Sequence, residues 1–320
     1  MSISKFKFLI LAIAIIIGSI VVTSLSMMQG KTVSPENIMR IGLIETDTED
    51  SWRQEMIEQV KLSAEKENIR IIEIETERTQ SAQINAIRSF IVYGVDAIVF
   101  SPVTNNGWDY VLEEAAKSSI AVVTINDVIN SEVEGSFASV TYDYRSLAES
   151  VTNALLKRAE ENGLAGENLK ILELKGAIGS TVSENISEGI RSALENSNGY
   201  KIGYSANADY MRSRAKELVN GWLIWNEYDM NVIIAHNDAM ALGAIDALEK
   251  NGLLPGRDIQ IVTFGGGEEV KELAAKGKIS YLAQCDLNGL GDKVVEIAIG
   301  LENNKHVPEI TYLNSYVSGG

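Results

Sequence analysis

The chain is 320 residues long and 45% hydrophobic. This length is greater than that of a typical domain with a single hydrophobic core, and it is enough for two lobes. Its 28 basic and 44 acidic residues give a formal net charge of −16, which would repel nucleic acid phosphates, so no nucleic acid partner is expected. The single cysteine, Cys285, excludes an internal disulfide, and the sequence has no Cys and His spacing typical of zinc sites, so we expect neither a metal nor a cofactor.

Residues 1–32 carry the features of an export segment. Lys5 and Lys7 precede an uncharged apolar run from Phe8 to Met28, and this order directs the chain that follows out of the cytoplasm. The run is close to the roughly 20 residues that span a bilayer, which favours an uncleaved signal anchor. Residues 24–26, however, offer the small-x-small pattern of a signal peptide cleavage site. The protein is therefore expected to be extracytoplasmic, either anchored to the cell membrane through its N-terminal helix or secreted or periplasmic.

From Arg40 onward, short β-branched and apolar runs alternate with segments of helical periodicity. This alternation is typical of parallel sheets covered by crossover helices, so the predicted class is α/β. Most of the runs are apolar throughout, as strands covered on both faces must be. The predicted strands are Arg40 to Ile44, Arg70 to Ile74, Ala97 to Phe100, Ala121 to Ile125, Ser139 to Thr141, Lys170 to Leu174, Lys201 to Ser205, Val232 to Ala235, Ile259 to Thr263 and Ile279 to Gln284.

The stretch from Asp127 to Phe137 combines acidic residues and glycine without strong periodicity, which favours a crossing between two lobes near Asn126. In open α/β sheets, ligands bind outside the carboxyl ends of the strands. The residues directly after each strand are therefore the candidates for a binding site.

No group of residues indicates an enzyme. His236 and His306 lie far apart in the sequence, and neither has a nucleophile motif beside it. The run from Gly265 to Gly267 lacks the lysine and the serine or threonine of a phosphate-binding loop, and we interpret it as a flexible loop of the pocket. The chain is therefore expected to bind a ligand without transforming it.

Five segments between Arg40 and Ile310 carry a recognisable pattern. They are Asp50 to Arg53, Gln83 to Phe90, Gly94 to Ile98, Ser101 to Val103 and Ala235 to Ala244, and the last continues into Gly252 to Ile259. With these segments the chain resembles the type I periplasmic sugar-binding proteins, in particular their ribose-binding and galactofuranose-binding branch.

The resemblance implies two Rossmann-like lobes with parallel sheets, joined by a hinge of three crossings. In this chain the expected N-terminal membrane helix precedes the two lobes. The crossings are expected near Asn126, Gln284 and Lys305. The N-terminal lobe would then comprise residues 40–126 plus 285–305, and the C-terminal lobe residues 127–284 plus 306–320. Ligand would close the lobes by bending the hinge.

By likeness to the family, a sugar would be bound at the strand ends. A sugar needs an aromatic face for its C–H surface and polar groups for its hydroxyls, because an unpaired buried hydroxyl costs about 1 to 3 kcal/mol. From the residues alone, Trp52 also begins an apolar helical stripe with Met56, Asn237 also suits a helix cap, and Asp238 is the expected cap of that helix. The candidate ligand-binding residues are Trp52, Arg53, Asn126, Asp127, Asn185, Tyr210, Asn237 and Gln284.

Three departures from the family pattern concern the ligand. Asn126 and Asp127 stand where sugar binders of this branch typically carry Asp-Arg, a further family arginine is absent at Ile186, and the triglycine run replaces a family aspartate. With fewer cations, and with Asp127 joined by Glu184, the pocket is expected to be more negative. An amino sugar or a polyol is thus an alternative to a neutral sugar.

Two functions fit this pattern. The first is an extracytoplasmic binding protein that delivers a sugar-like ligand to the permease of an ABC importer. The second is a membrane-anchored sensor whose ligand-bound form signals to a membrane receptor such as a histidine kinase. A repressor is not expected, because the export segment occupies the place where a DNA-binding helix-turn-helix would precede the lobes.

Overall fold

The computed structural model describes residues 38–133, 137–161, 169–195, 197, 201–225 and 230–319. The expected export helix within residues 1–32 lies outside the described residues. Within the described ranges, no helix is both long enough and apolar enough for a bilayer crossing.

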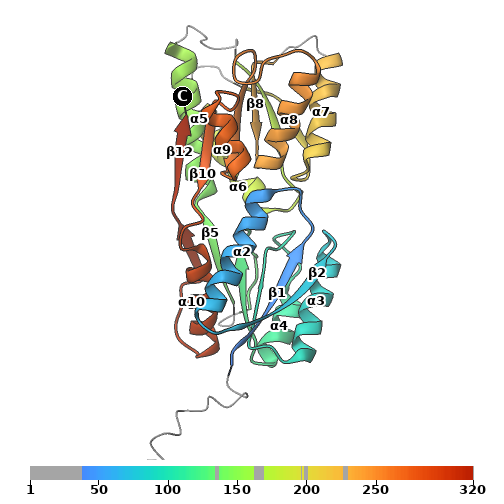
Figure 1. The fold of residues 1–320 in the computed structure, drawn as a ribbon, viewed down its shortest axis with the longest axis vertical. Helices are drawn as coiled ribbons and strands as arrows, with labels where there is room; N and C mark the ends of the chain where they lie inside the picture. The colour runs from blue at the N-terminus through green and yellow to red at the C-terminus, as the bar shows by residue number, and fades with distance from the viewer. Residues whose placement is uncertain are drawn as a thin grey trace, which may run out of the picture. The chain divides into compact units, whose positions relative to one another are not determined.

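The first of two α/β lobes is built on a six-stranded parallel sheet with the order β11-β5-β4-β3-β1-β2. Four helices, α2, α3, α4 and α10, pack on it, in the lower half of Figure 1. The strands are β1 (Arg40–Thr46), β2 (Arg70–Thr76), β3 (Ala97–Phe100), β4 (Ala121–Ile125), β5 (Phe137–Tyr142) and β11 (Ile310–Leu313). The helices are α2 (Ser51–Lys66), α3 (Gln80–Tyr93), α4 (Asp109–Lys117) and α10 (Leu290–Glu302).

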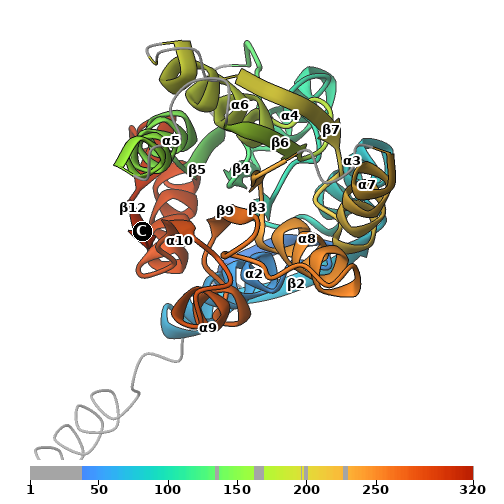
Figure 2. The same ribbon diagram turned by 90° about the horizontal axis from the view of Figure 1, so that it is seen from above.

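The second lobe repeats this plan with the strand order β12-β10-β9-β8-β6-β7, in which the β10 and β12 pair alone among its described pairs is antiparallel. Helices α5 and α6 pack together over one face of the sheet, and α7 and α8 pack over the other (Figure 2). The strands are β6 (Lys170–Lys175), β7 (Lys201–Asn207), β8 (Val232–Ala235), β9 (Gln260–Gly265), β10 (Tyr281–Cys285) and β12 (Ser315–Gly319). The helices are α5 (Tyr144–Glu161), α6 (Thr181–Glu195), α7 (Arg212–Trp225), α8 (Asp238–Lys250) and α9 (Glu268–Ala275).

The predicted strands and the apolar stripe that begins at Trp52 are confirmed. All ten predicted strands are present, and β3, β4 and β8 are buried along their whole length, as strands with helices on both faces must be. In α2 the predicted stripe of Trp52 and Met56 is buried, and it continues with Val60. Strands β11 and β12 were not predicted, because their half-buried residues lack the continuous apolar pattern of the other strands.

The chain passes between the sheets after Tyr142, after Cys285 and at Asn314. The crossing predicted near Asn126 is therefore wrong: the loop after β4 returns to the same sheet, where β5 pairs with β4. Residues 306–320 likewise do not all join the second lobe, because β11 pairs with β5 of the first sheet. The middle crossing lies next to the predicted Gln284.

The three crossings are hydrogen-bonded to one another. The Tyr142 hydroxyl donates to the carbonyl of Asp286 at 2.7 Å, and the Asp286 N–H donates to the carbonyl of Asn314 at 3.1 Å. Each bond joins a different pair of crossings. The three crossings therefore form one hydrogen-bonded strip between the lobes rather than three separate linkers.

Candidate functional site

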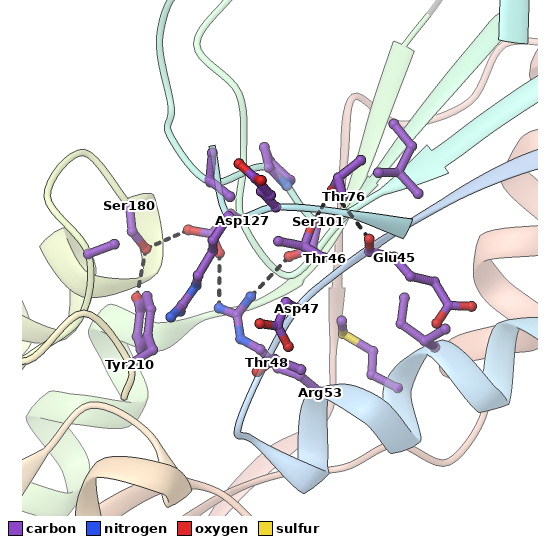
Figure 3. Close-up of a pocket in the computed structure, with 18 of the residues that line it drawn as sticks. Glu45, Thr46, Asp47, Thr48, Arg53, Thr76, Ser101, Asp127, Ser180 and Tyr210 are labelled. Atoms are coloured by element: carbon purple, nitrogen blue, oxygen red, sulfur yellow. Dashed lines mark hydrogen bonds and ion pairs between the residues drawn. The ribbon is translucent and has the colours of Figure 1, made fainter. Parts of the chain in front are cut away.

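A cavity of about 1130 Å³ lies between the lobes, at the carboxyl ends of the strands. The first lobe contributes the ends of β1, β2 and β3 and one face of α2, and the second contributes the segments after β6 and β7 (Figure 3). Polar side chains among the lining residues include Thr46, Asp47, Thr48, Arg53, Thr76, Arg78, Ser101, Asp127, Ser180, Asp209 and Tyr210.

A chain of polar contacts crosses the cavity from one lobe to the other. Arg53 of α2 forms an ion pair with Asp127, with 3.3 Å between Nη2 and Oδ2, and donates to the Ser101 hydroxyl at 3.2 Å. The other carboxylate oxygen of Asp127 accepts a hydrogen bond of 2.6 Å from the Ser180 hydroxyl in the second lobe. Ser180 and Tyr210 are joined hydroxyl to hydroxyl at 2.7 Å (Figure 3).

Tyr210 is held at the cavity by close packing and by an unusual backbone. Its ring lies beneath the guanidinium of Arg53, with 4.9 Å between the guanidinium carbon and the ring centroid. The ring also lies against Gly176, where an added Cβ would come within 2.0 Å of it. Burial raises the pKa of the Tyr210 phenol, which therefore stays protonated. Both Asp209 and Tyr210 have positive φ, at 51° and 60°, a backbone conformation that residues other than glycine rarely adopt.

Three of the eight predicted site residues, Arg53, Asp127 and Tyr210, line the cavity. Trp52 does not, because its indole packs on Tyr142 with 5.9 Å between ring centroids. The indole N–H is also bound to the carbonyl of Cys285, at 3.2 Å. Trp52 thus belongs to the apolar stripe of α2 that packs in the core. It does not provide an aromatic surface on the cavity wall on which a sugar could stack.

The four amides of the predicted set also lie outside the cavity lining. Asn126 is 2% exposed, accepts a hydrogen bond from the Tyr144 hydroxyl, and donates from its side-chain amide to Asp127 Oδ2 at 3.4 Å. Asn237 begins α8, where its side-chain oxygen accepts from the Met240 N–H at 3.0 Å. Asn185 and Gln284 are half-buried in α6 and β10.

The cap of α8 and the triglycine loop differ from their predictions. Asn237 is the cap, and Asp238 is the first residue of the helix. A carboxyl oxygen of Asp238 accepts hydrogen bonds from the N–H groups of Gly266 and Gly267, at 2.8 and 2.7 Å. A Cβ at Gly265 would lie 2.7 Å from this carboxyl group. The loop from Gly265 to Gly267 therefore wraps a buried carboxyl group and does not line the cavity.

The predicted set missed several lining residues that the strand-end rule points to. Thr46 ends β1, Thr76 ends β2, and Ser101 follows β3 directly. Arg78 lies two residues beyond β2, and Ser180 lies in the loop between β6 and α6. Likeness to the family predicted other positions as ligand-binding. The rule that ligands bind at the carboxyl ends of the strands would have predicted these five residues.

His236 is not part of the cavity. It is buried in the second lobe, 3.1 Å from Glu173 through Nε2 and 3.1 Å from the Ser183 hydroxyl through Nδ1. Glu173 also accepts hydrogen bonds of 2.6 Å from Ser187 and Ser205. These contacts satisfy the side-chain polar atoms of Glu173 and His236, so the cluster is part of the structure of the lobe.

Two α/β lobes with a polar cavity at their strand ends define a two-lobed binding protein. Residues 41–306 match the family described as periplasmic binding protein domain, and the chain belongs to this family. Membership in a family of binding proteins agrees with the expectation that the chain is not an enzyme.

Relatives of known structure or function bind sugars. The chain is 29% identical to the galactofuranose-binding protein YtfQ of Escherichia coli K12 over 256 residues, 79% of each protein. It is 28% identical to the binding protein of the arabinose ABC transporter of Shewanella sp. ANA-3, bound to arabinofuranose, with a TM-score of 0.81 over 88% of this chain and 91% of that one.

Two crystal structures from Mycobacterium smegmatis are each 26% identical to the chain and cover 88% of it and 91% of their own length. The structure in complex with β-D-fucofuranose superimposes with a TM-score of 0.82. The other superimposes with a TM-score of 0.63.

Proposed function

We propose that this protein binds a small sugar in its five-membered furanose form, outside the cell membrane, and delivers it to an ABC importer. The observation that carries the proposal is the polar chain of Arg53, Asp127, Ser180 and Tyr210 across the cavity. The guanidinium of Arg53 and the carboxylate of Asp127 lie side by side, and each can bind neighbouring hydroxyls of one sugar ring. The cavity is also larger than the roughly 300 Å³ at the lower end of small-molecule pockets.

The furanose form is supported by the shape of the aromatic surface and by the relatives. Tyr210 is the aromatic residue among the lining residues, and Arg53 covers its face. A ligand at this site therefore relies on hydrogen bonds more than on stacking against a broad pyranose face. The names of three relatives or their complexes specify galactofuranose, arabinofuranose and fucofuranose.

A thermal-shift panel with ring-locked sugars tests this function. Methyl furanosides and methyl pyranosides of arabinose, galactose and fucose are compared, since the methyl group prevents exchange between ring forms. We expect a furanoside at a hundredfold excess over its dissociation constant to stabilise the fold by about 2.7 kcal/mol, and its pyranoside partner to have little effect. A pyranoside that stabilises more than its furanoside would overturn the ring assignment, and no shift from any sugar would overturn sugar binding.

Amino sugars and polyols belong in the same panel because of the charge on the cavity wall. Seven carboxylates and three cations line it. The carboxylates are Glu45, Asp47, Glu58, Glu75, Glu77, Asp127 and Asp209, and the cations are Arg53, Lys61 and Arg78. An ammonium group on the sugar would be favoured by this excess of negative charge. A larger shift from an amino sugar than from its neutral parent would identify that class.

A sensor that signals to a membrane receptor is the second candidate, and the N-terminal sequence favours it. The apolar run from Phe8 to Met28 is long enough to anchor the chain, and only residues 33–39 separate its flank from the first lobe. We expect the mature protein to remain in the membrane fraction with the mass of the full chain. Intact-mass measurement of both fractions checks this, and a soluble chain that begins near Met27 would contradict the anchor.

A further inference from the structure

Arg78 is a residue of the cavity wall whose charge has no counter-charge. It lies two residues beyond the end of β2, is half-buried, and lines the cavity. Within the part of the chain that the structure describes, its side chain forms neither an ion pair nor a hydrogen bond. Moving a charged group partly out of water costs free energy, which an opposite charge or hydrogen bonds normally offset. The guanidinium of Arg78 is therefore available to a group of opposite charge.

The other cations of the cavity lining already have partners. Arg53 pairs with Asp127, with 3.3 Å between Nη2 and Oδ2. Lys61 pairs with Glu45, with 2.5 Å between Nζ and Oε1. Among the described lining residues, this leaves Arg78 as the cation whose N–H donors a ligand can use without breaking an existing ion pair.

The surroundings of Arg78 do not balance its positive charge. Burial lowers the pKa of the Arg78 guanidinium, and the charge of Arg53 lowers it further. Tyr210, Asp209 and Asp47 act in the opposite direction but do not outweigh these two effects, so the pKa stays below its ordinary value. A lowered pKa means that the site disfavours the charged form of the side chain. An anion bound beside Arg78 would remove this penalty.

The excess of carboxylates in the lining does not supply the missing counter-charge. Glu45, Asp127 and Asp209 are each paired with another cation, which for Asp209 is Arg214. The remaining carboxylates of the described lining are exposed, and water screens an exposed charge more strongly than a half-buried one. They are Asp47, Glu58, Glu75 and Glu77. The half-buried charge of Arg78 is therefore left for the ligand to neutralise.

We propose that Arg78 determines specificity by binding an anionic substituent of the ligand, so that the preferred sugar carries a carboxylate or a phosphate besides its hydroxyls. The inference rests on the proposed function, because it assigns a further group of the same ligand. Arg53 and Asp127 would bind hydroxyls of the ring, while Arg78 binds the anion through the planar fork of its guanidinium. Both guanidinium groups line the same cavity, so one ligand can contact both.

Matched sugars that differ in one terminal group test the inference. The probes are methyl arabinofuranoside and methyl galactofuranoside, the derivative of each whose terminal CH₂OH group is oxidised to a carboxylate, and the terminal phosphate ester of each. Isothermal titration with the full chain measures the dissociation constants. We expect an anionic derivative to bind at least about tenfold more tightly than its neutral parent. The carboxylate and phosphate arms show which of the two anions the site prefers.

Variants of Arg78 assign the preference to this side chain. Arg78→Gln removes the charge, so we expect the anionic derivative and its neutral parent to bind this variant with similar affinity. Arg78→Lys keeps the charge but loses the planar fork, so it should keep part of the preference. Arg70→Gln is the matched control, because it removes the same charge from the other end of β2, where the side chain is exposed and does not line the cavity. It should keep the preference of the parent.

Two results would overturn the role of Arg78 and leave sugar binding intact. One is a neutral furanoside that binds the parent as tightly as its anionic derivatives, and the other is an Arg78→Gln variant that keeps the preference or loses no more of it than Arg70→Gln. The first comparison uses the parent alone, so it decides the matter even if a variant does not fold. If none of these probes binds, the inference fails, and sugar binding fails with it only where the thermal-shift panel also shows no shift.

Discussion

Replacing Arg53 with alanine is expected to weaken binding of the sugar found in the thermal-shift panel by about a hundredfold, equivalent to about 2.7 kcal/mol. It is also expected to lower the free energy of unfolding by about 2 to 3 kcal/mol. Arg53 is the cation paired with Asp127, whose side chain is 2% exposed. Without it, that carboxylate keeps hydrogen bonds from Ser180 and Val182 but loses its counter-charge. Removing one partner of a buried ion pair costs more than the pair itself contributes.

Isothermal titration and denaturant unfolding measure the two effects of this substitution. Arg53→Lys keeps the charge but loses the planar fork above Tyr210, so we expect it to restore stability more than affinity. Arg88→Ala is the matched control, because Arg88 pairs with Glu114 on the exposed surface, with side chains 50% and 42% exposed. An Arg53→Ala variant that behaves like Arg88→Ala would remove Arg53 from the site.

Most strands of both sheets could be predicted from the sequence because each is a short apolar run that is recognisable without knowledge of distant contacts. Strand β8 is a run of four buried apolar residues from Val232 to Ala235 between polar neighbours, and that pattern has few other interpretations. The lobe boundary was harder to predict. Whether β5 pairs with β4 or begins the next lobe depends on contacts distant in sequence, including its pairing with β11 near residue 310.

The site was predicted only in part, because it also depends on features that a local sequence pattern does not fix. Arg53 and Trp52 are neighbours at the start of α2, and successive helical residues point about 100° apart, so they cannot share one face. Trp52 faces the core and Arg53 faces the cavity. Likeness to a family places both at a strand end but does not fix the rotation of the helix. The partner of Asp127 in the second lobe, Ser180, depends on how the lobes meet, which no local pattern encodes.

A carboxyl group buried between the lobes predicts an unusual dependence of stability on pH. Asp238 is 1% exposed, and burial together with the nearby charge of Asp50 raises the pKa of its carboxyl to about 8. In the unfolded chain the same pKa is close to 3.9. The folded state therefore holds this proton more tightly, so the stability from this group is complete below about pH 4 and is lost as the pH rises toward 8.

Asp238→Asn should remove that loss, because the amide is neutral at every pH and its oxygen can still accept from the N–H groups of Gly266 and Gly267. Each unit of pKa shift corresponds to about 1.4 kcal/mol, so between pH 5 and pH 8 we expect the variant to gain roughly 2 to 4 kcal/mol on the parent. Denaturant unfolding across this range measures the difference. The matched control is Asp246→Asn on the same helix, where hydrogen bonding to Arg212 lowers the pKa of the carboxyl, so that its contribution changes only at acid pH. Parallel curves for the parent and Asp238→Asn from pH 5 to 8 would mean that Asp238 is already ionised in the folded protein, and that the triglycine loop stabilises a carboxylate rather than a neutral acid.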